Sequence, residues 1–288
     1  MNKVPKIGFI GAGTVAKTLA LALSRKGYPV VAVSSRNGKS SAGIARLIED
    51  CHPCDNNQQV VDKAEFVFIA TPDDVIATVT DEIEWQSGQS VVHLSGADST
   101  AILAPAAKYG AFIGCIHPLQ TFAGSEQANL AGITYAIEAV KPLLAILKKM
   151  IEDLGGHCIE IKAKDKVLYH TAAVFACNYL VTLVKTATDL YKIIDIPQEE
   201  AIRALLPLLR GTINNIENSG IPQCLTGPID RGDSGTIKKH VKALQTASPD
   251  LLPLYRELGF KTMPVAMAKN SIDGKQAYEL EAILKEGR

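Results

Sequence analysis

The sequence lacks an excess of charge of either sign. Its 288 residues include 30 Lys and Arg and 30 Asp and Glu, so the formal net charge is zero. Proteins that bind nucleic acids or anionic membranes usually carry a basic surface, so we expect neither partner and favour a small molecule. Hydrophobic residues make up 47% and charged residues 21%, which is typical of a globular protein with a sizeable core.

The sequence also lacks the paired spacings of a structural zinc site. Six cysteines are scattered along the chain, and Cys51 and Cys54 form a lone CxxC without a second pair or spaced histidines. We therefore expect no metal, and disulfide exchange at this CxxC is the less favoured alternative. Unpaired cysteines indicate a reducing compartment, which we take to be the cytoplasm.

No long apolar run is free of polar groups. The first residues, MNKVPKIGFIGAG, break into glycines, which is not the pattern of a signal peptide. Residues 167–184 carry no charge but contain His170 and Asn178. We therefore expect a buried helix there and no membrane partner.

A glycine turn lies near the beginning of the sequence. Residues 6–16, KIGFIGAGTVA, read as an apolar strand, a turn and the start of a helix, with the GxGxxA pattern of a dinucleotide-binding site. The glycines permit a tight turn and the approach of a pyrophosphate to free N–H groups at the helix start. The predicted cofactor ligands here are Gly11, Ala12, Gly13, Thr14 and Val15.

The end of the second predicted strand indicates which dinucleotide binds. An NAD site would place a carboxylate there for the ribose hydroxyls, but this sequence has Ser34, Ser35 and Arg36. Hydroxyls and a guanidinium can hold a 2′-phosphate. We therefore predict NADP(H) as the cofactor.

Strands and helices alternate up to residue 162. Further strands are predicted within 66–74, 90–98, 111–122, 133–139 and 157–161. This alternation predicts an α/β Rossmann domain over residues 1–162, with a mostly parallel sheet whose strand ends gather the ligand-binding side chains. Those ends carry Thr71, Pro72, Ser95, Gly96 and His117.

Residues 163–288 lack strand-like alternation, so we predict an all-α domain there. Residues 164–194 read as one long helix, on which His170 and Asn178 share a face. They are either satisfied core residues or a pair that faces the nicotinamide. A second helix, residues 198–218, contains Pro207, which should kink or break it.

Residues 225–240, LTGPIDRGDSGTIKKH, combine turn formers with charges and hydroxyls. Asp233 or Ser234 can cap a following helix, which accounts for part of the segment. Thr226 and Arg231 are not explained by that role. We interpret them as substrate ligands.

Six segments together resemble a known group: GAGTVA, ATPDD, HLSGA, GCIHPLQTF, YHTAAVFACNYL and LTGPIDRGDSGTIKKH. They are similar to the two-domain Rossmann-like oxidoreductases whose C-terminal helical domain was long catalogued as of unknown function. That group includes an alternative ketopantoate reductase and is related to the 6-phosphogluconate dehydrogenase-like superfamily. The resemblance implies NADP-linked reduction of a small ketone or imine, with ketopantoate, pantothenate biosynthesis, a site between the domains and a homodimer as its specific expectations.

Reduction of a 2-oxo acid needs a proton donor and a cation for the carboxylate. His170 is our first candidate for the donor, followed by His117 and then Lys166, which we expect near solvent at the helix start. Asn178 is a candidate ligand of the carbonyl oxygen or of the nicotinamide amide. Ser95, Gly96, Thr226, Arg231 and Asp233 are the predicted substrate ligands, with Arg231 on the carboxylate and Asp233 orienting it.

Two alternatives remain at this point. His117-Pro118 resembles the His-Pro of prephenate and arogenate dehydrogenases, so oxidation of a hydroxy acid is one of them. The other is a sensor that binds NADP without turnover.

Overall fold

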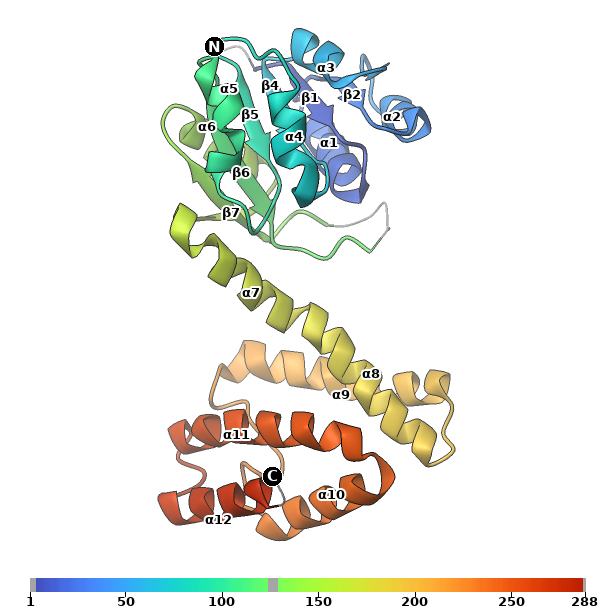
Figure 1. Cartoon of the computed structure of the whole chain (residues 1–288), viewed down its shortest axis with the longest axis vertical. Coiled ribbons are helices and arrows are strands. Elements are labelled where there is room, and N and C mark those ends of the chain that lie inside the picture. The colour runs from blue at the N-terminus through green and yellow to red at the C-terminus, as the bar shows by residue number, and fades with distance from the viewer. Residues whose placement is uncertain (1–3, 124–128, 287–288) are drawn as a thin grey trace. The chain divides into compact units, whose positions relative to one another are not determined.

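The computed structural model describes residues 4–123 and 129–286. Contacts divide the chain into two compact units, Met1–Asn178 and Tyr179–Arg288 (Figure 1). The division falls after the start of the long helical stretch, whereas the sequence pattern changes near residue 163. The boundary between residues 1–162 and 163–288 stays a prediction.

The first unit is built on an eight-stranded sheet in the order β3-β2-β1-β4-β5-β6-β7-β8. Only β6 and β7 pair in antiparallel fashion within this sheet; its other neighbours are parallel. The reversal of strand order between β1 and β4 is the place where open α/β sheets bind ligands. The strands are β1 Ile7–Ile10, β2 Val30–Ser34, β3 His52–Cys54, β4 Phe66–Ile69, β5 Ser90–His93, β6 Phe112–Pro118, β7 Thr134–Ala139 and β8 His157–Glu160.

Helices cover both faces of the sheet. One face packs against α1 and α6, whose leucines, among them Leu19, Leu23 and Leu147, are buried with Phe9 and Phe68. The other face packs against α3, α4 and α5 in a second apolar core. These helices are α1 Thr14–Arg25, α2 Gly38–Ala45, α3 Asn57–Lys63, α4 Ile76–Asp81, α5 Ala104–Lys108 and α6 Leu143–Asp153.

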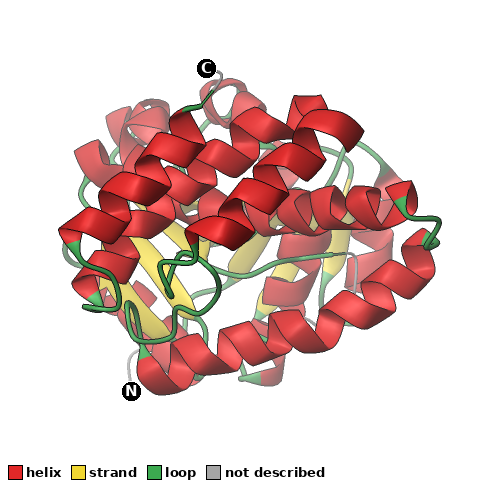
Figure 2. Cartoon of the chain, turned by 90° about the horizontal axis from the view of Figure 1, so that it is seen from below, coloured by secondary structure: helices red, strands yellow, loops and turns green. Residues whose placement is uncertain are grey.

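The described residues of the second unit form helices joined by loops, and no strand lies among them (Figure 2). Its core gathers apolar side chains of α10, α11 and α12, including Ile237, Ala266, Leu280 and Leu284. The elements are α8 Asn178–Ile193, which begins at the unit boundary, α9 Gln198–Ser219, α10 Ser234–Ala247, α11 Leu252–Ala268 and α12 Gly274–Lys285. A mostly parallel α/β sheet followed by an all-helical region confirms the predicted fold class.

Pro207 does not break α9, which continues from Gln198 to Ser219, so the predicted break is wrong and a kink stays a prediction. Pro207 lies in the middle of the helix, where its ring removes one backbone N–H donor. The helix tolerates this loss because only Ala201 among its residues is buried, so water can satisfy the freed carbonyl.

The long helical stretch differs from its prediction in burial. It comprises α7 Lys166–Ala176 and α8, separated at Cys177, and the whole of Ala163–Ile193 is long and apolar enough to cross a membrane by length and composition. None of its most apolar window is buried in the chain, so the expectation of a buried helix is wrong. Phe175 and Val181 are 65% and 69% exposed. The apolar cores of both units close without any residue of α7 or α8.

Candidate functional site

The predicted glycine turn joins β1 to α1. Gly11 has a φ of +103°, and a Cβ at this position would lie 2.5 Å from the carbonyl oxygen of Ala70. No atom lies within 4 Å of the position that a Cβ of Gly13 would take. The turn is therefore closed toward β4 at Gly11 and open toward a ligand at Gly13, where the N-terminus of α1 presents its backbone N–H groups.

A cavity of about 550 Å³, here called the cofactor cavity, adjoins this turn. Predicted ligands that line it are Gly11, Ala12, Gly13, Ser35, Arg36, Thr71 and Pro72. Thr71 also carries a buried hydroxyl oxygen without a hydrogen-bond partner among the described residues, so a bound molecule can take up that bond. The residues present thus fit a dinucleotide.

The end of β2 is organised by hydroxyl and amide groups. Ser34 is buried and donates its hydroxyl to Asn57 Oδ1 at 2.8 Å, so it supports the cavity lining instead of joining it. Ser35 donates to the carbonyl oxygen of Asn37, and the Asn37 side chain caps α2 by accepting the Lys39 N–H. Arg36 therefore projects from a fixed turn. The one acidic residue of the lining, Glu82, follows α4 and not β2.

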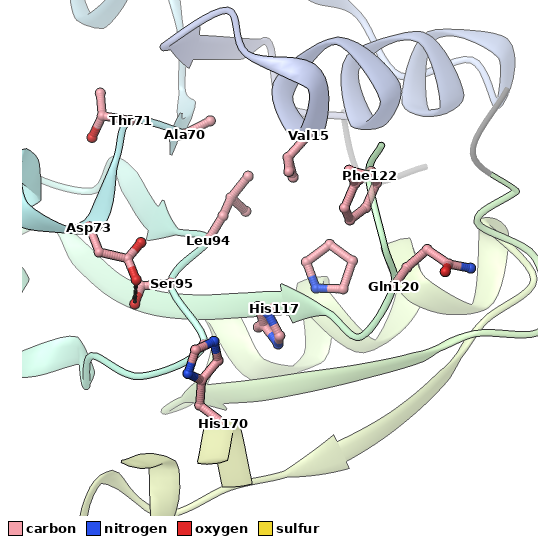
Figure 3. Close-up of a pocket in the computed structure, with 12 residues that line it drawn as sticks. Val15, Ala70, Thr71, Asp73, Leu94, Ser95, His117, Gln120, Phe122 and His170 are labelled. Atoms are coloured by element: carbon pink, nitrogen blue, oxygen red, sulfur yellow. Dashed lines mark hydrogen bonds between the residues drawn. The ribbon is translucent and has the colours of Figure 1, made fainter. Parts of the chain in front are cut away.

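A smaller cavity of about 260 Å³, here called the histidine cavity, shares Ala70 and Thr71 with the cofactor cavity. Figure 3 shows its side chains converging from several elements. Val15 comes from α1, Ser95 follows β5, His117 lies in β6 and His170 lies on α7. The remaining lining residues are Ala70, Thr71, Asp73, Leu94, Gly96, Pro118, Gln120 and Phe122.

The two histidines lie edge to face, with ring centroids 5.9 Å apart. Both rings lie against Gly96, which belongs to the loop after β5. A Cβ at residue 96 would lie 2.6 Å from His170 Cδ2 and 2.9 Å from His117 Nε2. Glycine is therefore required at this position for both imidazoles to reach the cavity.

His117 is held by one hydrogen bond and kept neutral. Its Nδ1 lies 2.8 Å from the hydroxyl oxygen of Tyr169. Burial, assisted by the nearby His170 and Lys166, lowers the pKa of His117 to about 4. A neutral imidazole at pH 7 can share a hydrogen bond with a substrate oxygen, but it carries no extra proton to give.

Lys166 is buried, and the expectation that it lies near solvent is wrong. It is only 3% exposed, and its Nζ donates to the carbonyl oxygen of Ser95 at 3.1 Å and to Cys115 Sγ at 2.7 Å. The long side chain reaches back from the start of α7 into the sheet, which explains the burial. Burial raises the pKa of Cys115 to about 11, with Lys166 opposing the rise. Lys166 does not line the histidine cavity.

Ser95 ties two acidic residues to the loop after β5. Its hydroxyl oxygen lies 2.7 Å from Asp73 Oδ2 and 3.0 Å from Asp98 Oδ2, and it accepts the N–H groups of Ala97 and Asp98. The residue is 3% exposed. Ser95 thus fixes the loop that contains Gly96.

The remaining predicted substrate ligands lie in the second unit. Asp233 caps α10, as one of the two sequence interpretations held, because its carboxylate accepts the N–H and the hydroxyl of Thr236. Arg231 and Thr226 are exposed. The N–H and the hydroxyl of Thr236 lower the pKa of Asp233, and the positive charge of Arg231 adds a smaller contribution. Lys269 holds the same loop through Leu225 and Asp230.

Sequence reasoning missed several lining residues. Gln120 and Phe122 belong to the HPLQTF segment, which pointed to the group but not to roles for its side chains. Tyr169 precedes the predicted donor, and its contact with His117 depends on a residue 52 positions away. Asn57 gave no signal at all, because its place beside Ser34 follows from the packing of α3 on β2.

Asn178, His170 and Val174 line one cavity, and the predicted common face of these three residues stays a prediction. Asn178 is absent from the lining of the histidine cavity. A role at the nicotinamide stays a prediction for this pair.

Two family models cover most of the chain. Residues 2–118 match the Rossmann-like domain, and residues 133–262 match a domain of unknown function, DUF2520. The 2-(hydroxymethyl)glutarate dehydrogenase of Eubacterium barkeri is 26% identical over 192 residues. That match spans 62% of this chain and 61% of the relative, less than two thirds of its length.

Solved structures share the fold over nearly the whole chain. A Bacteroides fragilis protein proposed to be an NADP oxidoreductase is 25% identical, with 90% of this chain and 98% of that one covered and a TM-score of 0.73. A Thermotoga maritima protein is 24% identical, with coverages of 92% and 99% and a TM-score of 0.74. The NADP-bound pyrroline carboxylate reductase of Plasmodium falciparum shares the fold at 14% identity, with coverages of 98% and 98% and a TM-score of 0.60.

The fold is that of NAD(P)-dependent dehydrogenases and reductases. A family model matches each of the two domains that the sequence resemblance implies. The chain therefore combines a match to a Rossmann-like domain with a match to DUF2520, in the order that the sequence resemblance implies.

Proposed function

We propose that the protein is an NADPH-dependent reductase of a small 2-oxo acid, with ketopantoate as the candidate substrate and pantoate as the product. The observation that carries this proposal is that two cavities adjoin. The cofactor cavity and the histidine cavity share Ala70 and Thr71, so a dinucleotide at the glycine turn would lie next to the cavity that holds His117 and His170.

When bound, NADPH supplies a hydride to the carbonyl carbon. The carbonyl oxygen then gains a negative charge and needs a proton. His117 is neutral near pH 7 and steadies this oxygen by a hydrogen bond. His170, its edge-to-face neighbour in the same cavity, is the proposed proton donor.

Two other residues are treated differently. Lys166 is not proposed as the donor, because its Nζ is already engaged with Ser95 and Cys115. The exposed Arg231 is the proposed ligand of the substrate carboxylate.

NADP(H) is favoured over NAD(H) by the residues that follow β2. Ser35 and Arg36 line the cofactor cavity, and no carboxylate stands at that strand end. The Bacteroides fragilis and Plasmodium falciparum structures, whose names refer to NADP, support the same choice.

The apolar exposed surface of the long helix supports a homodimer. Val167, Phe175 and Val181 on α7 and α8 are each more than 60% exposed, and Leu208 on α9 is 66% exposed. Monomers rarely expose so many large apolar side chains together, so we propose that a second copy covers them.

The test of the function is NADPH oxidation, followed by absorbance, with ketopantoate, an NADH control and a panel of 2-oxo acids. Turnover with NADPH supports the reductase. NADPH binding without turnover of any carbonyl compound contradicts it and favours a sensor. Faster NADP⁺ reduction with a hydroxy acid would favour the dehydrogenase direction, to which the Eubacterium barkeri relative points.

A further inference from the structure

A third cavity of the first unit adjoins the histidine cavity. Its volume is about 540 Å³, within the range of roughly 300–1,000 Å³ that is usual for small-molecule sites. It shares His117, Gln120 and His170 with the histidine cavity. The two imidazoles therefore stand at the junction of a small space beside the cofactor cavity and a larger space on their other side.

The larger space, here called the apolar cavity, has no Asp, Glu, Lys or Arg among the described residues that line it. Its polar members, such as Gln120, Thr121 and Asn178, are uncharged near pH 7. Its apolar members come from the chain after β6, from β8 and from α7, and they are Leu119, Ile159, Ala172, Ala173, Val174 and Ala176.

The small side chains of α7 create this space. Tyr169, Ala173 and Ala176 follow one another at helical spacings of four and three residues, so they lie on one face of the helix. Ala173 stands one turn beyond the histidine pair. A larger side chain at residue 173 would project into the cavity next to His170.

We propose that the apolar cavity binds an uncharged apolar side chain of the substrate, so that the 2-oxo acids reduced here are those with a bulky hydrocarbon group beside the carbonyl. This inference rests on the proposed reductase function. The carbonyl lies at the two imidazoles and the hydrocarbon group lies over Ala173. The carboxylate points away from the apolar cavity, because its described lining includes neither Lys nor Arg and His170, the proposed proton donor, is engaged at the carbonyl oxygen.

The same argument sets an order among substrates. Each methylene buried in an apolar site strengthens binding by about fourfold. Turnover expressed as kcat/KM therefore rises from pyruvate to 2-oxobutyrate to 3-methyl-2-oxobutyrate. Oxaloacetate, whose side chain is similar in size but charged, is a poor substrate.

The experiment compares Ala173→Leu, which fills the cavity, with Thr171→Leu, which adds the same side chain at an exposed position of α7 outside the lining. Calorimetry on the NADP⁺-loaded protein measures the Kd of 3-methyl-2-oxobutyrate and of pyruvate. We expect Ala173→Leu to weaken 3-methyl-2-oxobutyrate by about tenfold or more while it changes pyruvate by about twofold or less, since several buried methylenes are lost. Thr171→Leu leaves both unchanged.

Equal weakening of both acids by Ala173→Leu, or wild-type affinity that does not depend on side-chain size, would overturn the inference. Tm of each variant reports whether the leucine disturbs folding. Because binding is measured without hydride transfer, the result is separate from the proposed function. Ligands that bind in the expected order without NADPH oxidation would contradict the reductase and support the apolar cavity.

Discussion

The hydroxyl oxygen of Tyr169 lies 2.8 Å from Nδ1 of His117, and the two rings meet edge to face with centroids 5.6 Å apart. This contact joins the first turn of α7 to the end of β6. It leaves Nε2 of His117 directed toward Gly96 and the histidine cavity. The tyrosine therefore orients the ring that we propose to hold the carbonyl oxygen.

Tyr169→Phe removes this hydrogen bond while it keeps the ring. We expect kcat to fall by roughly two- to tenfold, the equivalent of one neutral hydrogen bond, with the Kd of NADPH unchanged. Steady-state kinetics and a binding titration measure the two quantities. Tyr278→Phe, at a 73% exposed position, is the matched control. If Tyr169→Phe retained wild-type kcat, the contact would have no role in turnover.

Gly96→Ala places a methyl group against both imidazoles. Since its Cβ would lie under 3 Å from His170 Cδ2 and from His117 Nε2, one ring must move out of the cavity. We expect kcat/KM to fall by about a hundredfold, the scale of losing positioned acid–base catalysis, with Tm close to wild type. Gly43→Ala, where a Cβ meets no atom within 4 Å, serves as the control. Equal kcat/KM in both variants would show that the histidines do not depend on this spacing.

Arg36→Ala tests the cofactor preference. The guanidinium lines the cofactor cavity, and loss of a charged hydrogen bond to a 2′-phosphate should raise the Kd of NADPH by roughly ten- to a hundredfold. The Kd of NADH should change little, because that cofactor lacks the phosphate. Fluorescence titration of both cofactors gives the comparison, and Lys39→Ala controls for the loss of a nearby positive charge outside the lining. A parallel weakening of NADH would argue against phosphate recognition by Arg36.

Two buried histidines make stability depend on pH. Burial, followed by the charge of Lys166, lowers the pKa of His93 from 6.5 to about 3, and the pKa of His117 falls from 6.5 to about 4. The unfolded chain binds more protons than the folded protein below pH 6.5. The contribution of these histidines to the free energy of unfolding is therefore greatest above that pH and decreases as the pH falls toward 4.

The midpoint of unfolding by urea, measured between pH 4 and 6.5, tests this dependence. In His117→Gln the free energy of unfolding should decrease less steeply as the pH falls. The same decrease in the variant and the wild type would show that His117 is not the titrating group. Activity offers a second readout. Because His117 is still neutral at pH 5, we expect it to hold the carbonyl oxygen there as it does at pH 7.

The exposed helices predict self-association. Light scattering should give a mass of twice the 30.8 kDa chain without detergent, and Val181→Lys should reduce it to that of one chain. Burying a lysine in an apolar interface leaves its charge without a partner. Val140→Lys, at a 70% exposed position of the first unit, should leave the dimer intact. A monomeric wild type would contradict the dimer.

Most of the fold could be predicted from periodicity, because strands such as β1, β2, β4 and β5 are apolar runs followed by turn formers. β3 escaped because it is short and contains Pro53 between the cysteines of the CxxC, both of which are buried as free thiols. The burial predicted for residues 167–184 was wrong because an apolar sequence shows that its side chains favour burial, but not whether the rest of the chain folds over them.

The site was only partly predictable. His117 and His170 are identifiable as polar residues at a strand end and on an apolar helix, but their distance depends on how α7 packs against the loop at Gly96. Lys166 was placed near solvent because it begins a helix, yet a lysine stem is long enough to reach Cys115 inside the sheet. No local sequence pattern shows that the Lys166 side chain reaches into the sheet.

The central claim is hydride transfer to a carbonyl carbon in the histidine cavity. The most direct measurement uses NADPH that carries deuterium at C4 on one face or the other, with ketopantoate as the acceptor and mass spectrometry of the product. We expect deuterium at the new C–H bond of pantoate from one labelled face only, and loss of this product in His170→Ala. Tight NADPH binding with no label in any product would contradict it.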